Sequence, residues 1–315
     1  MHPALSVILF TTASGAGYGM LFWLGTFSIT NTLPSDRFFA PVSLALALAA
    51  ISGGLISSTF HLGHPERAWR AISQWRSSWL SREGLVALAT YVPAGLFGIG
   101  LVVFHRSDGF WAACGGLAAV GAFSSVVCTA YIYRSLKPVQ RWANAWVVPN
   151  YLALAAMTGG LWLTALAATF GIGRPAIGWL AVILVLPAAV LKLGYWRYID
   201  RTTSTSTAET ATGLGSIGAV TMLDPPHTSD NYLLKEMGFR VARRHASRLR
   251  RISFVTAFVL PVLLIVGGLY VGGTSLIILS LIAAPLSTFG VLIERWLFFA
   301  EAKHTVMLYY GAARA

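Results

Sequence analysis

The sequence has little charge and almost no cysteine. Only 11% of its 315 residues are charged, whereas soluble domains carry about 25%. Its two cysteines, Cys114 and Cys128, fall in one predicted helix about 21 Å apart, which is beyond the reach of a disulfide. An iron–sulfur cluster needs about four ligands. The sequence therefore argues against an ordinary soluble domain and excludes a disulfide between these residues or a cysteine-bound cluster within this chain.

Apolar residues make up most of the chain instead. Hydrophobic residues account for 56% of the sequence, the mean hydropathy is +0.67, and about 20 consecutive apolar residues suffice to cross a bilayer. We predict an all-α, polytopic integral membrane protein with eight transmembrane helices. We expect the first helix to be retained, because it lacks the basic leader and cleavage site of a secretory signal. The predicted spans are about 5–30, 42–60, 84–104, 111–134, 147–170, 176–196, 253–272 and 275–299.

Positive charge is concentrated on one side of these spans. Of the 23 Lys and Arg residues, only Arg37, Arg106 and Arg174 lie in loops of the opposite side. Positively charged loops remain in the cytoplasm, so we expect a bacterial inner-membrane protein with both termini cytoplasmic. The net charge of +12 suits anionic lipid headgroups. Because the basic residues are dispersed among apolar spans, we expect contact with membrane lipids and not with nucleic acid.

The chain is predicted to be a single membrane domain over residues 1–315, with one hydrophilic cytoplasmic loop at about 197–252. Within this loop, Thr202–Thr207 is of low complexity, as in mobile segments. Asn231–Arg251 favours an Arg-rich helix, of a kind that lies on a membrane surface or docks a partner. The same segment is explained equally well as a basic connector, whose positive charge only keeps the loop in the cytoplasm.

Residues that can transfer protons gather at the cytoplasmic ends of the second and third spans. His61 ends the second span, and an imidazole accepts a proton near neutral pH. Glu83 follows Ser81, a good N-cap, in the first turn of the third span, where a carboxylate also favours the helix dipole. Arg67 lies in the connecting loop, where Arg commonly anchors a helix at the membrane boundary. Glu83 and Arg67 therefore each have a structural explanation beside the functional one.

Tyr18 is a fourth candidate. It lies in the small-residue stretch Ser14–Gly19, which close helix packing explains most simply, but its hydroxyl needs a partner when buried. We expect no metal site. Pro65 prevents a regular helix through His61 and His64, and no His or Cys cluster completes a ligand set.

Glu294 and Arg295 form a second group near the end of the last span. If they lie at membrane depth, their charges are costly and often functional. If they lie at the interface, the Arg295 side chain extends to the surface. The sequence leaves both positions open for this pair.

These residue types suit quinone chemistry. A quinol loses two protons and two electrons, and His and carboxylate groups can take up protons near neutral pH. We predict an exchangeable quinone or quinol and no tightly bound cofactor. The sequence reveals no electron carrier, so electrons must pass to or from a partner subunit. The candidate quinone-site residues are His61, Glu83, Arg67 and Tyr18.

The sequence resembles the DmsC family, the membrane-anchor subunits of dimethyl sulfoxide reductase-type molybdoenzymes, which are related to the NrfD-like quinone-interacting proteins. The resemblance covers essentially the whole chain. Its most specific segments are His2–Gly19, His61-Leu62-Gly63 with Arg67-Ala68, and Ser81-Arg82-Glu83.

That resemblance implies an anchor subunit of an oxidoreductase complex, in which an iron–sulfur subunit links it to a molybdopterin catalytic subunit. The molybdenum centre and the clusters would belong to those partners. In the family, the His and Glu at the positions of His61 and Glu83 are implicated in quinol binding. The segment Thr221–Arg251 departs from the dimethyl sulfoxide reductase anchors and is similar to sulfite-oxidising members.

Two other functions remain open. A purely structural anchor predicts that quinone-linked turnover survives replacement of His61 or Glu83. A transporter predicts charges and broken helices near the membrane midplane, whereas the charges in this sequence are expected mainly at span ends. The sequence does not determine the substrate of the complex, the quinone type, the stoichiometry, the direction of electron flow or any contribution to proton-motive force.

Overall fold

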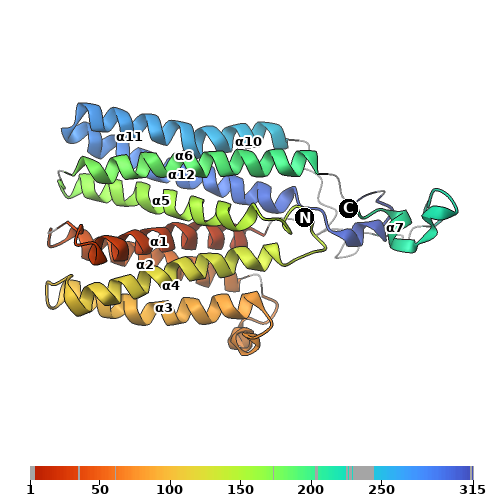
Figure 1. Ribbon diagram of the computed structural model, residues 1–315, viewed down its shortest axis with the longest axis horizontal. Coiled ribbons are helices and arrows are strands. Elements are labelled where there is room, and N and C mark those ends of the chain that lie inside the picture. Colours follow the sequence, from red (N-terminus) through yellow and green to blue (C-terminus); the bar gives the residue numbers. More distant parts are fainter. Residues whose placement is uncertain are drawn as a thin grey trace.

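Eight long helices form the body of the protein, shown as a computed structural model in Figure 1. It describes residues 4–34, 36–60, 62–172, 174–202, 205–224, 226, 229, 245–312 and 314. Within these residues, eight spans are long and apolar enough to cross a membrane, which confirms the predicted fold. The first six and the eighth are α1 (Leu5–Ile29), α2 (Phe39–Thr59), α3 (Trp79–Val102), α4 (Gly109–Arg134), α5 (Val147–Thr169), α6 (Pro175–Arg201) and α12 (Gly273–Ala300).

The seventh span is a composite helix over Ala246–Val271. It consists of α10 (Ala246–Phe254), the π-helical turn η3 (Val255–Val259) and α11 (Leu260–Val271). Both this span and α6 extend past the predicted limits at their charged ends. Hydropathy marks only the apolar part of a helix, whereas the backbone hydrogen bonds of the helix continue into the charged residues. Most of the helix predicted over Asn231–Arg251 lies outside the described residues, which resume at His245.

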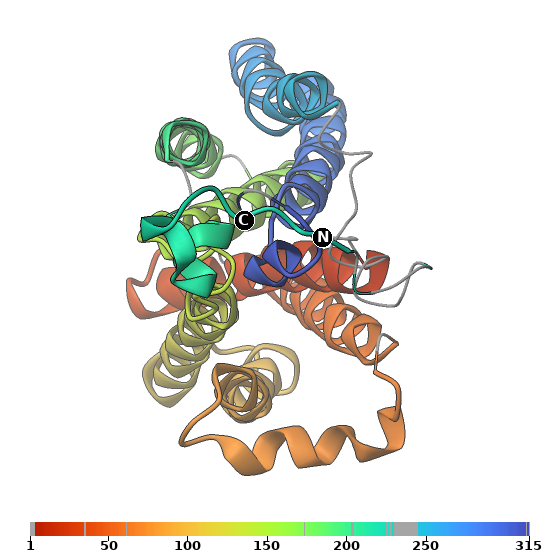
Figure 2. The ribbon, with the colours of Figure 1, turned by 90° about the vertical axis from the view of Figure 1, so that its right-hand side faces the viewer.

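Both chain ends lie at the same end of the bundle, which we call the terminal face (Figure 1). Figure 2 looks onto this face and shows a short helix lying across it between the ends of α2 and α3. An antiparallel bridge joins Thr207 to Arg314, and the part of the chain that the structure describes contains no β-strand. The short helices are η1 (Pro65–Gln74), α7 (Ala208–Thr212), η2 (Leu214–Ser216) and η4 (Thr305–Leu308).

Helix α1 packs against α2, α4, α5 and α12. Glycine permits two of these close approaches. A Cβ at Gly17 would press on Ala47 of α2, and a Cβ at Gly19 would collide with the backbone of Ala155 on α5. Gly15 faces open space. Close packing therefore explains Gly17 and Gly19 as predicted, and it fixes the intervening Tyr18 in the interior of the bundle.

Candidate functional site

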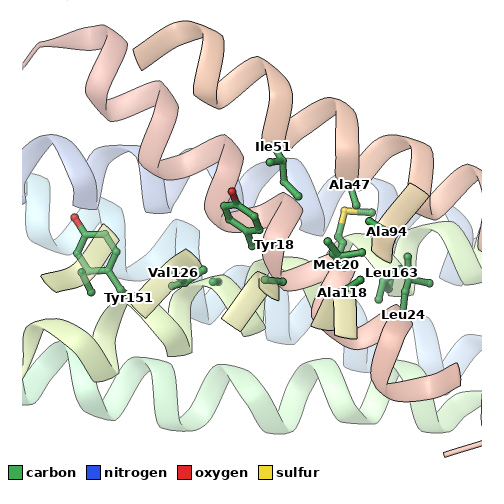
Figure 3. Close-up of a cluster of buried hydrophobic side chains, with 14 of the residues drawn as sticks. Tyr18, Met20, Leu24, Ala47, Ile51, Ala94, Ala118, Val126, Tyr151 and Leu163 are labelled. Atoms are coloured by element: carbon green, nitrogen blue, oxygen red, sulfur yellow. The ribbon is translucent and has the colours of Figure 1, made fainter. Parts of the chain in front are cut away.

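Tyr18 lies in the interior of the bundle with its polar end unsatisfied. The residue is 3% exposed, and its hydroxyl has no hydrogen-bond partner among the described residues. Ser125 acts on it as a hydrogen-bonding side chain that does not reach regular hydrogen-bond geometry, and Glu83 acts on it through its charge. Figure 3 shows Tyr18 in the buried cluster with Val126 and Tyr151 from neighbouring helices. A buried hydroxyl without a partner is rare, so this position is suited to a polar ligand atom or a water molecule.

Glu83 is also buried, but its setting differs from the predicted one. The N-cap of α3 is Ser78, whose hydroxyl accepts from the Ser81 amide, and no acidic residue lies in the first turn. Ser81 instead donates its hydroxyl to the Ala71 carbonyl. The prediction of Ser81 as N-cap was therefore wrong, because α3 begins at Trp79, before the apolar run. The helix-dipole explanation of Glu83 is correspondingly weaker.

The Glu83 carboxylate binds across to α4. It accepts a hydrogen bond from the hydroxyl of Thr129, whose single proton is shared with the Ser125 carbonyl at 3.0 Å. Glu83 is 5% exposed and no cation of the described residues pairs with it. Glu83 thus has the chemistry of a group that can gain or release a proton.

A small polar cavity lies between α1, α4, α5 and α12. Its volume is about 20 Å³, which is enough for a water molecule. Three hydroxyls on its wall, those of Thr12, Tyr18 and Tyr151, have no hydrogen-bond partner among the described residues. Thr129, the partner of Glu83, and Arg295 also line it. The cavity therefore brings groups from four helices around one space that a polar group can fill.

A second, apolar cavity adjoins the first. It has a volume of about 290 Å³ and is formed by residues of α1, α4 and α5. Tyr18, Val126 and Ala155 line both cavities. Phe123 on its rim is 47% exposed, so the apolar cavity lies at the lipid-facing side of the bundle. Tyr18 thus separates an apolar recess from a polar interior.

Three charged residues are buried beyond the polar cavity. Arg295 and Glu294 of α12 are 2% and 1% exposed, and Lys192 of α6 is 1% exposed. Glu294 pairs with Lys192 through one oxygen and lies 3.0 Å from the Arg295 Nε through the other. The Arg295 guanidinium stands 3.7 Å from the ring centre of Tyr151. Of the two positions left open for Glu294 and Arg295, the structure shows the interior one.

Charged groups outside the spans lie apart from these cavities. At the end opposite the terminal face, hydrogen bonds from Arg106 to Asp108 at 2.9 and 3.1 Å raise the pKa of Arg106 and lower the pKa of Asp108. At the terminal face, burial lowers the pKa of His304. The His304 Nδ1 accepts from the Val306 amide at 3.0 Å, which requires that nitrogen to be unprotonated.

Comparison with known proteins identifies the family. The family model described as DMSO reductase anchor subunit (DmsC) matches residues 1–311. The chain belongs to the DmsC family. It is also 36% identical over 330 residues to a sulfite dehydrogenase subunit of Allochromatium vinosum, an alignment that covers 98% of this chain and 99% of that protein. These findings confirm the predicted resemblance, including its sulfite-oxidising subgroup.

In this DmsC-family chain, two of the four predicted site residues come together. Tyr18 lines the polar cavity, whereas Glu83 lines neither cavity and is linked to the polar one through Thr129. Arg67 lies on η1, where its side chain is 58% exposed and 3.7 Å from Glu66, and it lines neither cavity. These surroundings agree with the explanation that Arg67 anchors a helix at the membrane boundary. His61 lies outside the described residues.

Lys192 is the main residue that sequence reasoning missed. It falls within the predicted span 176–196, and α6 buries it in the bundle. The sequence held one signal, since Lys192 directly follows an apolar run and precedes Tyr195 and Trp196. Their rings lie 4.2 and 5.3 Å from its amine, an arrangement that stabilises a cation away from water.

Proposed function

We propose that this chain is the membrane-anchor and quinone-interacting subunit of a molybdopterin oxidoreductase complex. It exchanges electrons between the quinone pool and an iron–sulfur partner subunit, which connects to a catalytic subunit with the molybdenum centre. The similarity to a sulfite dehydrogenase subunit favours a complex of the sulfite-oxidising type. We further propose that it lies in a bacterial inner membrane with the terminal face in the cytoplasm, since that face carries most of the basic residues.

The position of Tyr18 between the two cavities carries this proposal. A quinone has an apolar tail, an apolar ring and two oxygens that need hydrogen-bond partners. The apolar recess beside Phe123 suits the tail and ring, and the unpartnered Tyr18 hydroxyl can donate to an oxygen. Ligand pockets commonly combine apolar walls with a few polar groups in this way.

Residues of this chain would orient the quinone ring, exclude water and transfer protons. Tyr18 orients the ring by its hydroxyl, and Val126 and Ala155 exclude bulk water from it. Glu83, which Thr129 links to the polar cavity, takes up or returns a proton, and the Thr129 hydroxyl holds its orientation. His61 remains a predicted member of the site. Arg67, being exposed, is proposed to contact lipid headgroups or quinone on its way in, and not the bound ring.

The two alternatives are less well supported. The argument against a transporter was that charges are expected mainly at the ends of the spans. Three buried charges depart from this expectation, those of Lys192, Glu294 and Arg295. However, these charges pair with one another, whereas a transported ion needs coordinating groups left unpaired. A purely structural anchor gives no reason for three unpartnered hydroxyls around one cavity.

Replacement of Tyr18 tests the proposal. Tyr18→Phe removes only the hydroxyl and should weaken binding of a hydroxyquinoline N-oxide inhibitor to the purified complex about tenfold, since one hydrogen bond contributes about 1 kcal/mol or somewhat more. Tyr270→Phe, at a 93% exposed tyrosine of α11, is the control and should leave binding unchanged. Equal inhibitor affinity in wild type and Tyr18→Phe would leave the structural anchor as the better explanation.

A further inference from the structure

The buried cluster of Lys192, Glu294 and Arg295 holds one more positive charge than negative. An Arg guanidinium does not deprotonate in proteins, and Glu294 is held ionised between two cations. The surplus proton is therefore the one on the Lys192 amine. Its loss leaves a neutral cluster with the Glu294–Arg295 pair intact.

The cluster also touches the polar cavity. Arg295 lines the cavity and lies 3.0 Å from Glu294, and Glu294 contacts Lys192 directly. A water molecule in the cavity thus has a short path of polar groups to the Lys192 amine. The charged and titratable groups that face Lys192 are Glu294 and Arg295 of α12, Tyr195 of its own helix, and Glu301 just past α12.

From Lys192 the polar groups continue to the terminal face. Tyr195 donates its hydroxyl to the Arg141 carbonyl at 3.1 Å. Glu301, which is 4% exposed, lies 2.8 Å from Arg250. Arg250 in turn binds Asp200 at 2.7 Å, and the Asp200 side chain is 53% exposed. Glu301 acts on Lys192 through its charge, and the ion pairs of Glu301, Arg250 and Asp200 lead from there to the surface.

We propose that Lys192 carries protons between the polar cavity and the terminal face, with Glu294 on its inner side and Glu301 on its outer side. This inference rests on the proposed function. Reduction of one quinone takes two electrons, delivered singly by an iron–sulfur carrier of the partner subunit, and two protons; oxidation of the quinol releases both. Lys192 would take these protons from, or pass them to, water at the terminal face, so that none has to cross the apolar recess.

Two substitutions at one position separate this function from a structural one. Lys192→Met removes the charge, and Lys192→Arg keeps the charge and the ion pair but cannot release a proton. Both should slow menadione-linked turnover of the purified complex by about tenfold or more and raise its solvent deuterium isotope effect. Lys137→Met, at an exposed lysine between α4 and α5, is the control and should behave as wild type.

Binding of the hydroxyquinoline N-oxide inhibitor distinguishes the two proposals. Both Lys192 variants should retain wild-type inhibitor affinity. Wild-type turnover in Lys192→Arg would show that the lysine only completes an ion pair and would overturn the proton route. Absence of inhibitor binding in the wild-type complex would instead overturn the quinone site itself. If Lys192→Arg does not assemble, Lys192→Met, which leaves the Glu294–Arg295 pair intact, tests the proposal by itself, and the same slow turnover is expected.

Discussion

Glu83 of α3 accepts a hydrogen bond from the Thr129 hydroxyl of α4, a residue 46 positions later in the chain. Both side chains are buried. Thr129 lines the polar cavity, so this bond links a carboxylate at the start of one helix to the interior of the bundle. The sequence identified Glu83 as a candidate site residue, but it did not identify Thr129.

Removing the Thr129 hydroxyl should loosen this contact. Thr129→Val has nearly the same shape but leaves the Glu83 carboxyl without its donor, which typically costs about 1–3 kcal/mol for a buried group. We expect a lower melting temperature of the detergent-solubilised complex and weaker inhibitor binding. Thr129→Ser keeps the hydroxyl and is the matched control. Equal melting temperatures for the Val and Ser variants would show that the bond contributes nothing measurable.

His61→Ala is expected to impair quinone-analogue binding and quinone-linked turnover without preventing assembly of the complex. The reason is chemical: a neutral imidazole at the membrane surface can accept a proton and then donate two hydrogen bonds. Co-purification of the partner subunits measures assembly, and inhibitor titration measures binding. Unchanged affinity in a fully assembled variant complex would remove His61 from the site.

Gly19 should be far less tolerant of a side chain than Gly15, although both lie in the same small-residue stretch. A Cβ at Gly19 collides with the backbone of Ala155, whereas one at Gly15 meets nothing within 4 Å. Gly19→Ala is expected to destabilise the α1–α5 contact by about 1–3 kcal/mol. Thermal unfolding of the two single variants measures this difference. A Gly19→Ala protein as stable as Gly15→Ala would contradict the close packing of α1 on α5.

The orientation of the bundle can be tested by cysteine labelling in intact cells. Both native cysteines are buried, so the background should be low. Thr32→Cys, in the exposed turn after α1, should react with a membrane-impermeant maleimide added outside. Ser73→Cys, exposed on η1, should react only after the membrane is opened, because the basic loops stay in the cytoplasm. The reverse pattern would place the terminal face in the periplasm.

His304 should make the segment after α12 sensitive to acid. Burial lowers its pKa below the ordinary value of 6.5, so the folded state favours the neutral imidazole and the unfolded chain binds the proton more readily. Stability is therefore full above that ordinary value and is lost as the pH falls through the lower folded pKa. Amide exchange over Thr305–Leu308 should accelerate on acidification. In His304→Asn, which keeps a capping acceptor but does not titrate, the acceleration should be absent.

The sequence alone determined the number and approximate position of the eight spans, because the length of an apolar segment needed to cross a bilayer is a local property. It also supplied the family resemblance and singled out Glu83 and Tyr18. It misplaced the start of α3 and the end of α6, since hydropathy does not register a helix that continues into polar residues.

Only the tertiary structure decided which polar groups meet. Lys192 and Glu294 lie 102 residues apart, and their pairing depends on α6 and α12 presenting facing positions at one depth. The shared wall of Tyr18, Val126 and Ala155 likewise arises where α1, α4 and α5 converge. Such juxtapositions follow from helix packing, which depends on long-range contacts that no single segment encodes.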